Sequence, residues 1–217
     1  MSEPDFLTSA RAFYDAVAED YADHFRDVLA ARPLDRAMLA AFAELVRADF
    51  PGEGPVVELG SGPGWVAAYL HGLGLDVSGI DLSPRMVELA RRTYPGLRFT
   101  EGSLLELPLA DGGLAGAVAW YSIIHTPQER LPEVFAEFHR VLAPGGHLLL
   151  AFQVGDRPLR VEQPYGHPVA LDFRRGQPDR IAELAAGAGL EVTTRLVREP
   201  EGEEKTRQAC LLARRPA

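Results

Sequence analysis

Cysteine is nearly absent from this sequence of 217 residues. The single cysteine, Cys210, excludes a disulfide within the chain and any cysteine-rich metal site. Its apolar surroundings, ACLLA, favour a buried thiol over a reactive nucleophile. No two histidines or cysteines stand at the spacing of metal ligands, and the G-x-S-x-G motif is missing. We therefore expect neither a metal site nor a nucleophile of that type.

Long uncharged segments are also missing. The longest stretch without a charge or a histidine, residues 112–124, has 13 residues, which is too short to span a bilayer. The first ten residues, MSEPDFLTSA, are acidic and polar and do not resemble a signal peptide. We therefore expect a cytoplasmic protein that does not bind membranes.

Positive charge is scarce, since the sequence has 22 Lys and Arg residues but 31 Asp and Glu residues. Lys205 is the only lysine. The resulting net charge of -9 argues against binding to nucleic acid or to an anionic membrane surface. The length suits one domain, and the sequence contains no repeat or linker. We therefore expect a single domain over residues 1–217, and the oligomeric state stays open.

The first 50 residues have helical periodicity. Apolar residues recur every three or four positions in 6–25, and a second amphipathic segment follows Pro33 and ends at FPGEGP. After Pro55, short apolar runs alternate with helical segments, which indicates a parallel sheet covered by helices on both faces. We therefore expect a helical cap over 1–50 and an α/β core over 55–217.

The boundaries within this core follow from local signals. Ser83 and Pro84 predict a helix start, and a capping box from Thr126 to Glu129 predicts another. Two β-rich runs around PEGEE predict a hairpin, so one strand near the C-terminus should be antiparallel. Residues 154–170, with three prolines, are expected to form one long irregular loop. Strands are expected at 56–60, 76–82, 97–102, 115–121 and in HLLLAF, and helices at 63–73, 84–94, 127–142 and 178–188.

Three glycines lie between the first predicted strand and the next helix, where backbone N–H groups often meet a ligand. Their spacing, Gly60-x-Gly62-x-Gly64, differs from the G-x-G-x-x-G pattern of dinucleotide-binding proteins. Glu58 stands two positions before Gly60, where it would repel a pyrophosphate. Asp81 ends the second strand and is placed to accept hydrogen bonds from both hydroxyls of a ribose. This pattern favours a positively charged ligand that has a ribose and no phosphate.

These residues resemble the class I S-adenosylmethionine-dependent methyltransferases. VVELGSGPGW is similar to their first motif, GIDLSPRMVELAR to their second, and RVLAPGGHLLLAF to the segment entering their fifth strand. FYDAVAEDYADHF is similar to the cap motif of the small-molecule branch that includes ubiquinone and menaquinone biosynthesis methyltransferases. The resemblance extends from Phe13 to Arg214. It implies a doubly wound, Rossmann-like seven-stranded sheet, mostly parallel, with S-adenosylmethionine as cofactor and S-adenosylhomocysteine as product.

The resemblance also implies a cofactor site. Tyr14 and Tyr21 would close over the methionine end of the cofactor. The alternative for both is packing on the helix face, which explains Tyr21 equally well because it lies on the apolar stripe. Ser103 stands where many relatives carry an acidic residue, and its oxygen can still accept a hydrogen bond from the adenine. The remaining contacts would come from Glu58 to the ammonium group, Gly60, Ser61 and Gly62 to the methionine portion, Asp81 to the ribose, and Leu82, Met86 and the Leu104 N–H to the adenine.

The acceptor side is expected beyond the fourth strand. His125 is the candidate general base, since a histidine accepts a proton near neutral pH; the alternative is that it only fills the surface at a helix start. Trp120 and Tyr121 should form a wall between cofactor and substrate, one of them facing the core because strand residues alternate. Tyr165 and His167 are candidates to line the acceptor pocket, although at least one of them is expected to be solvated in the long loop after the fifth strand.

Three functions fit this pattern. The leading hypothesis is methylation of a small molecule, with oxygen slightly favoured over nitrogen or carbon because of His125. The sequence WYSI stands where nucleic-acid amino-methyltransferases carry an Asn/Asp-Pro-Pro-aromatic motif, which argues against that substrate class. The alternatives are a module that binds S-adenosylmethionine or S-adenosylhomocysteine without turnover, and a nucleotide-dependent oxidoreductase, against which the glycine spacing and Glu58 count.

Overall fold

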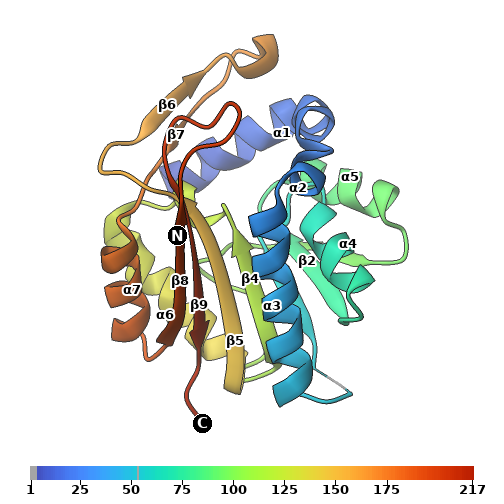
Figure 1. The fold of residues 1–217 in the computed structure, drawn as a ribbon. Coiled ribbons are helices and arrows are strands. Elements are labelled where there is room, and N and C mark those ends of the chain that lie inside the picture. The colour runs from blue at the N-terminus through green and yellow to red at the C-terminus, as the bar shows by residue number, and fades with distance from the viewer. Residues whose placement is uncertain (1–3, 53) are drawn as a thin grey trace.

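A seven-stranded sheet forms the centre of the structure, a computed structural model that describes residues 4–52 and 54–217 (Figure 1). The strand order is β3-β2-β1-β4-β5-β9-β8, and β9 alone runs antiparallel to its neighbours. The predicted α/β class and the C-terminal hairpin are therefore confirmed. The strands are β1 (Val56–Leu59), β2 (Val77–Asp81), β3 (Arg98–Glu101), β4 (Leu114–Trp120), β5 (Leu142–Gln153), β8 (Glu191–Arg198) and β9 (Gln208–Arg214).

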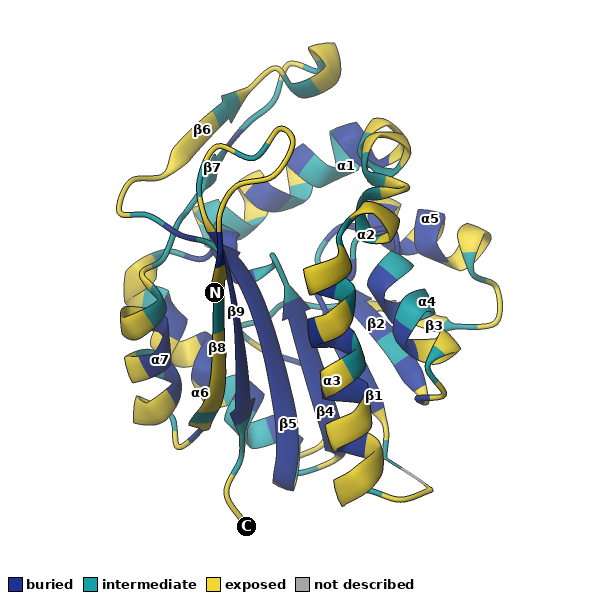
Figure 2. Cartoon of the chain, in the orientation of Figure 1, coloured by how far each residue is buried: buried dark blue, intermediate teal, exposed yellow. Residues whose placement is uncertain are grey.

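Helices cover both faces of the sheet. One face carries α3 (Pro33–Asp49), α4 (Trp65–Gly72) and α5 (Pro84–Thr93), and the other carries α6 (Leu131–Val141) and α7 (Pro178–Gly187) (Figure 1). Alternate residues of β5 therefore enter two cores: Leu148 and Leu150 lie in the core beside α6 and α7, and Leu149 and Ala151 in the core beside α3 and α4. Figure 2 shows the buried central strands between helices whose outer faces are exposed. Among the described residues, no helix is long and apolar enough to cross a membrane.

The N-terminal helix α1 (Asp5–Phe25) lies across the carboxyl edge of the sheet, and the short α2 (Val28–Ala31) joins it to α3 (Figure 1). Phe13 and Val17 of α1 are buried against Leu171, and Ala18 packs against Met86 and Leu89 of α5. The helix thus covers the edge at which the parallel strands end, where ligands bind in open α/β sheets.

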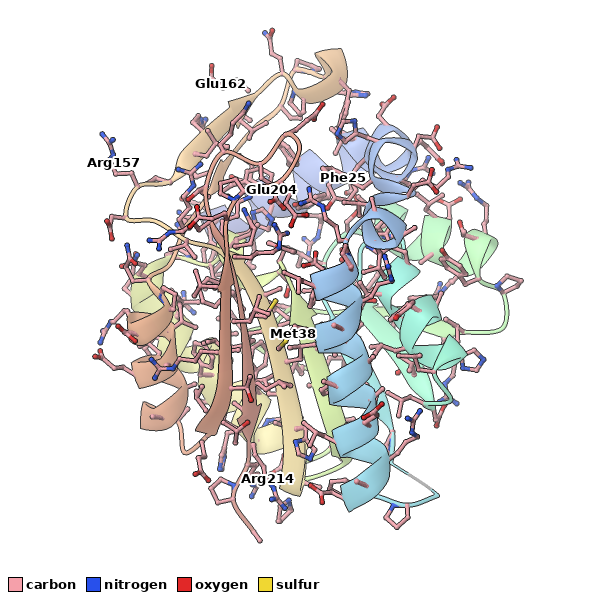
Figure 3. The ribbon with its side chains drawn as sticks, in the orientation of Figure 1. Phe25, Met38, Arg157, Glu162, Glu204 and Arg214 are labelled. Atoms are coloured by element: carbon pink, nitrogen blue, oxygen red, sulfur yellow. The ribbon has the colours of Figure 1, made fainter. Side chains whose placement is uncertain are left out.

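The prediction of one irregular loop over 154–170 is wrong. Here β6 (Leu159–Glu162), the short helix η3 (Pro164–Gly166) and β7 (Ala170–Phe173) form a hairpin with its own two-stranded sheet. The cross-strand pairs Leu159–Phe173 and Val161–Leu171 turn apolar side chains toward α1, where Phe173 meets Phe13 at 5.8 Å between ring centroids. In Figure 3, Arg157 and Glu162 extend from the outside of this hairpin, and Glu204 lies nearer α1.

The predicted helix over 127–142 begins later than its capping box indicates. Two short 3₁₀ turns, η1 (Ile123–His125) and η2 (Gln128–Arg130), come first, and no side chain caps α6 at Leu131. Pro132 explains the shift, because proline fits the first turn of a helix but disrupts its interior. Thr126 is therefore a buried residue between two turns and not a helix cap.

Candidate active site

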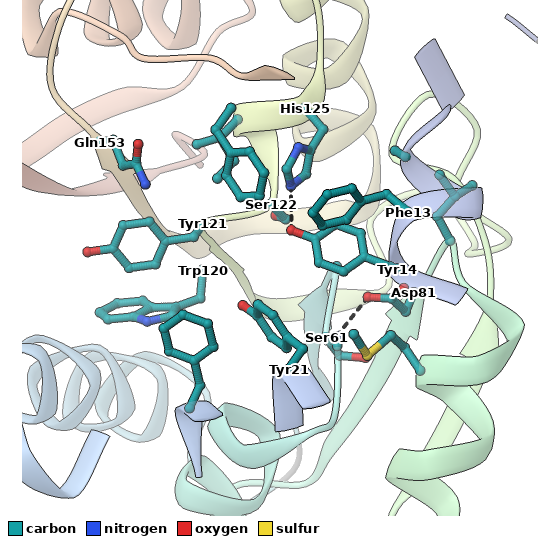
Figure 4. Close-up of a pocket in the computed structure, with 18 of the residues that line it drawn as sticks. Phe13, Tyr14, Tyr21, Ser61, Asp81, Trp120, Tyr121, Ser122, His125 and Gln153 are labelled. Carbon is teal, nitrogen blue, oxygen red and sulfur yellow. Dashed lines mark hydrogen bonds between the residues drawn. The ribbon is translucent and has the colours of Figure 1, made fainter. Parts of the chain in front are cut away.

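A cavity of about 470 Å³ lies at the carboxyl edge of the sheet, beneath α1 and the β6–β7 hairpin (Figure 4). Its volume suits a small-molecule ligand. Every residue that the sequence predicts for the site lines this cavity except His167. The structure therefore brings together side chains from α1, from the glycine loop and from the ends of β2 and β4.

The glycine loop uses its N–H groups within the protein. Gly60 and Ser61 both donate to the carbonyl of Ile80, at 2.7 and 2.9 Å, and Gly62 donates to Asp81 Oδ2 at 2.7 Å. Within the described chain, no group donates to the carbonyls of Gly60 and Gly62. The N–H groups of Gly60, Ser61 and Gly62 are therefore already bonded within the protein. The loop offers acceptors, which suit a cationic group.

The three glycines serve different purposes, although all have positive φ. A Cβ on Gly60 would lie 2.3 Å from Ser122 Cβ, and one on Gly64 would lie 2.6 Å from the ring of Phe99. A Cβ on Gly62 would meet no atom within 4 Å. Close packing within the protein therefore explains Gly60 and Gly64, and only Gly62 borders open space.

Asp81 is a buried carboxylate held by two backbone groups at the end of β2. Gly62 N–H donates to Oδ2 at 2.7 Å and Ser83 N–H donates to Oδ1 at 2.8 Å. Burial raises the pKa of Asp81 to about 6, against the lowering effect of these two hydrogen bonds. Each carboxylate oxygen keeps a further lone pair with which it can accept a ligand hydroxyl.

Glu58 has a structural role that the sequence did not indicate. Its Oε2 accepts a hydrogen bond from Ala67 N–H at 2.8 Å, in the first turn of α4. The N-cap residue of α4 is Gly64, which has no side chain, so Glu58 supplies the cap from the neighbouring strand. Burial raises the pKa of Glu58 well above its usual range, and the side chain also lines the cavity.

Tyr14 and Tyr21 extend from α1 into the cavity (Figure 4). The Tyr14 hydroxyl lies 2.7 Å from Nε2 of His125, and Tyr21 stacks on Trp65 with 5.7 Å between ring centroids. The two tyrosine rings meet edge to face at 5.6 Å. Burial raises the pKa of both hydroxyls, so both keep their protons near neutral pH.

His125 ends η1 and is uncharged near neutral pH. Burial lowers its pKa to about 4, the backbone of Asp172 opposes this shift, and the positive charge of Arg174 adds to it. Tyr14 occupies Nε2, and Nδ1 has no hydrogen bond of good geometry with any described residue. A proton that leaves the cavity for His125 therefore has to pass through the Tyr14 hydroxyl or displace it.

Trp120 and Tyr121 both line the cavity, so the expectation that one of them faces the core is wrong. The backbone of Tyr121 has a φ of 57°, in the left-handed region, and this ends the alternation of β4. The two rings meet edge to face at 5.8 Å. The strained backbone thus turns two successive aromatic side chains toward the same space.

The adenine contacts implied by the resemblance lie on the β2 and β3 side of the cavity. Met86 is buried there, and Leu82 and Leu104 are partly exposed to the cavity. The Ser103 hydroxyl accepts a hydrogen bond from Leu105 N–H at 3.2 Å. The structure therefore groups these side chains around an apolar space.

Tyr165 and His167 have separate positions, although both belong to the β6–β7 hairpin. Tyr165 lies at the rim of the cavity, 5.7 Å from the ring of His24 between centroids. Nε2 of His167 lies 2.8 Å from Asp20 Oδ2 on α1. His167 therefore connects the hairpin to α1 instead of lining the pocket.

Several lining residues were not identified from the sequence. Asp35 is buried and accepts from Arg198 Nε at 3.3 Å, and Glu204 accepts from both terminal nitrogens of the same guanidinium at 2.6 and 2.7 Å. Asp35 and Arg198 are far apart in the sequence, so no local pattern indicates them. Ser122, Gln153 and Arg175 also line the cavity and are among the other polar residues that were missed.

Comparison with known proteins places this geometry among methyltransferases. A protein-family profile described as a methyltransferase domain matches residues 56–146. The demethylmenaquinone methyltransferase of Chlorobaculum parvum is 33% identical over 142 residues, which make up 64% of this chain and 57% of that protein. The chain therefore spans little more than half the length of this relative.

Two solved structures share the fold. The 1,6-didemethyltoxoflavin-N1-methyltransferase of Burkholderia thailandensis, with bound 1,6-didemethyltoxoflavin and S-adenosylhomocysteine, has a TM-score of 0.70 and 19% identity, and the match covers 100% of this chain and 92% of that one. The [4+2]-cyclase SpnF has a TM-score of 0.71 and 16% identity, covering 96% of this chain and 95% of that one. At these identities the similarity establishes the architecture, which hosts more than one chemistry.

Proposed function

We propose that this chain is a class I, S-adenosylmethionine-dependent methyltransferase and that it transfers a methyl group from S-adenosylmethionine to a small molecule. One observation carries the proposal. The enclosed cavity has a buried carboxylate, Asp81, beside a glycine loop that presents free carbonyl oxygens. This end of the cavity suits a cationic ligand with a ribose.

The residues present fit the cofactor. Asp81 has acceptor capacity for two ribose hydroxyls, and the carbonyls of Gly60 and Gly62 and the carboxylate of Glu58 suit an ammonium group. The Ser61 hydroxyl is buried and has no partner in the described chain, so it is available for a ligand. The bound cofactor supplies a methyl group activated by a sulfonium. Leu82, Met86, Ser103 and Leu104 would enclose the adenine.

We infer that the protein's own contribution is alignment, exclusion of water and removal of a proton. α1 and the β6–β7 hairpin cover the cavity, which holds the reacting groups apart from solvent. Oxygen is the favoured acceptor atom, because the Tyr14 hydroxyl can take a proton from an acceptor hydroxyl while its own proton passes to His125 Nε2. The enclosed space and the chain's net charge of -9 favour a small acceptor over a nucleic acid.

A second candidate is a module that binds the cofactor or its product without turnover. The pKa of about 4 makes His125 a weak base, and the SpnF similarity demonstrates that the fold also accompanies other activities. Methyl transfer remains compatible with this weak base if the acceptor needs no general base. The acceptor atom would then be nitrogen or carbon instead of oxygen.

Calorimetric titration with S-adenosylhomocysteine, with nicotinamide adenine dinucleotide as control, tests the cofactor. Micromolar binding of the first compound alone is expected. Incubation with S-adenosylmethionine and a panel of hydroxylated and amine metabolites, followed by mass spectrometry, then tests transfer. A product 14 Da heavier than its acceptor supports the enzyme. Binding of S-adenosylhomocysteine without any such product favours the binding module. If neither S-adenosylhomocysteine nor nicotinamide adenine dinucleotide binds, both candidate functions are rejected.

A further inference from the structure

Arg175 is an arginine of the cavity for which the described residues provide no hydrogen-bond or ion-pair partner. Its side chain lines the cavity and is partly buried. Within residues 4–52 and 54–217, Nε has no hydrogen-bond acceptor and no carboxylate lies within 4 Å of the guanidinium. By contrast, Arg198 is held by Asp35 and Glu204. In a chain with an excess of acidic residues, an unpaired and partly buried arginine indicates a position reserved for a ligand.

Gln153 lies beside Arg175 and faces the same way. Val154 pairs with Gly176 in an isolated parallel bridge, and Gly176 N–H donates to the carbonyl of Gln153 at 3.0 Å. Val154 is buried in the core, and a Cβ on Gly176 would meet Ile181 of α7 at 2.9 Å. Residues 153 and 175 therefore point to the opposite side, into the cavity.

Gln153 is also incompletely satisfied. Its Oε1 is buried and has no hydrogen-bond partner among the described residues. The Nε–H of Arg175 also has no acceptor among the described residues, and a ligand carboxylate would satisfy this donor, while Gln153 would contribute through its amide NH₂ group.

This cluster lies at the opposite end of the cavity from the proposed cofactor site. Gln153 ends β5 and Asp81 ends β2, and these strands are three positions apart in the sheet, which corresponds to roughly 14 Å. Figure 4 shows Gln153 and Asp81 on opposite sides of the cavity. Glu58 and Asp81 make the cofactor end acidic, so the cavity is polarised along its length.

The neighbouring acids do not cancel the charge of Arg175. Asp35 and Glu204 are both paired with Arg198, and Glu204 also lies 3.2 Å from Arg32, so two arginines offset these two carboxylates. The side chain of Glu203 is 88% exposed and is therefore screened by solvent. Lys205, exposed at the rim, adds positive charge on this side.

We propose that Arg175 and Gln153 bind a carboxylate of the methyl acceptor, which is then a small acid with an apolar or aromatic body. The planar guanidinium matches a carboxylate in shape and charge. The rings of Trp120, Tyr121 and Phe173 line the space between the two polar ends and suit the apolar body. This inference rests on the proposed function and specifies its substrate class.

Matched ligand pairs test the proposal without knowledge of the natural acceptor. We would titrate the protein, saturated with S-adenosylhomocysteine, with benzoate, phenylacetate and indole-3-acetate, each against its primary amide, and follow binding by NMR. We expect the carboxylate of at least one pair to bind about tenfold more tightly than its amide, as is typical of charge-assisted hydrogen bonds. In Arg175→Met the two members of that pair should bind within about threefold of each other.

Controls separate this proposal from loss of fold and from failure of the proposed function. Arg157→Met changes an exposed arginine outside the cavity and should keep the carboxylate preference. Gln153→Glu should weaken carboxylate binding and leave the amide unchanged. Unchanged affinity for S-adenosylhomocysteine shows that each variant is folded. If the wild type binds S-adenosylhomocysteine but no carboxylate better than its amide, or if Arg175→Met keeps the preference, the proposal is wrong. Failure of the wild type to bind S-adenosylhomocysteine instead rejects the proposed function.

Discussion

The hydroxyl oxygen of Tyr14 lies 2.7 Å from Nε2 of His125, so α1 and the segment after β4 are joined by a hydrogen bond inside the cavity. Tyr14 is 111 positions from His125 in the sequence. The titratable imidazole of His125, at the edge of the sheet, is thus in contact with the Tyr14 hydroxyl of α1. Both side chains line the cavity, and an acceptor reaches Nε2 of His125 only through this hydroxyl or by displacing it.

We expect Tyr14→Phe and His125→Gln to be non-additive in methyl transfer. If the proton passes through Tyr14 to His125, either change removes the whole path, and each should lower kcat by about 10²-fold or more. The double variant should then be no slower than the slower single variant. Rates with the best acceptor of the metabolite panel measure this, and Tyr69→Phe, outside the cavity on α4, is the control. Effects that multiply would show that the two residues act independently.

His125 should also make stability depend on pH. Its pKa is about 4 in the folded protein and near 6.5 when unfolded, so protons bind preferentially to the unfolded chain between these values. The contribution of the neutral histidine is complete above pH 6.5 and is lost as pH falls toward 4. The wild type should therefore lose about 3 kcal/mol relative to His125→Gln over this range.

Urea unfolding of both proteins from pH 4 to pH 8 measures this difference. Above pH 7 the gap between their unfolding free energies should be constant, which serves as an internal control. Asp81 and Glu58 titrate with the opposite sign in both proteins, so they cancel in the comparison. Parallel curves through the whole range would mean that His125 keeps an ordinary pKa.

The parts of the structure that follow from sequence are those determined by local patterns. The strands of the parallel sheet include continuous apolar runs such as Leu114–Trp120, and Ser83 does cap α5 by accepting from Met86 N–H at 3.1 Å. The glycine spacing indicates a sharp turn, and Asp81 follows from its position at a strand end. Each of these signals spans only a few residues.

The parts that were missed depend on long-range contacts or on unusual backbone. The left-handed φ of Tyr121 cannot be inferred from a strand pattern, although it decides where two aromatic rings point. The β6–β7 hairpin depends on packing against Phe13, and Arg175 lies beside Gln153 only because of a bridge across 22 positions. Such juxtapositions arise from tertiary structure, so propensity and periodicity do not contain them.

The glycine loop provides a test that separates packing from ligand space. Both Gly60→Ala and Gly62→Ala place a side chain at positive φ, which costs about 1–2 kcal/mol. Gly60→Ala also brings Cβ to 2.3 Å from Ser122 Cβ, and such overpacking adds roughly 1–3 kcal/mol. Thermal unfolding should therefore show Gly60→Ala as the less stable variant. Adding Ser122→Gly should recover part of this loss, and equal stability of the two alanine variants would contradict the close approach.

Asp81→Asn should weaken S-adenosylhomocysteine binding and alter its pH dependence. The ionised carboxylate accepts from two hydroxyls, and its pKa of about 6 means that it gains a proton as pH falls below that value. Wild-type affinity should therefore decrease from pH 7.5 to pH 5. Asparagine keeps one oxygen for Gly62 N–H but loses the charge, so at pH 7.5 the affinity should fall about tenfold or more.

The comparison of pH profiles identifies the carboxylate responsible. Calorimetric titrations at pH 5, 6, 7 and 7.5 should give a ratio of wild-type to Asp81→Asn affinity that decreases toward acid pH. Glu58→Gln serves as the second variant, because the raised pKa of Glu58 provides another possible origin of the same decrease. If the ratio of wild-type to Asp81→Asn affinity is constant with pH and the ratio of wild-type to Glu58→Gln affinity changes, the pH dependence originates from Glu58. Wild-type affinity in Asp81→Asn at every pH would mean that the ligand does not contact the end of β2, and the proposed orientation of the cofactor in the cavity would then be wrong.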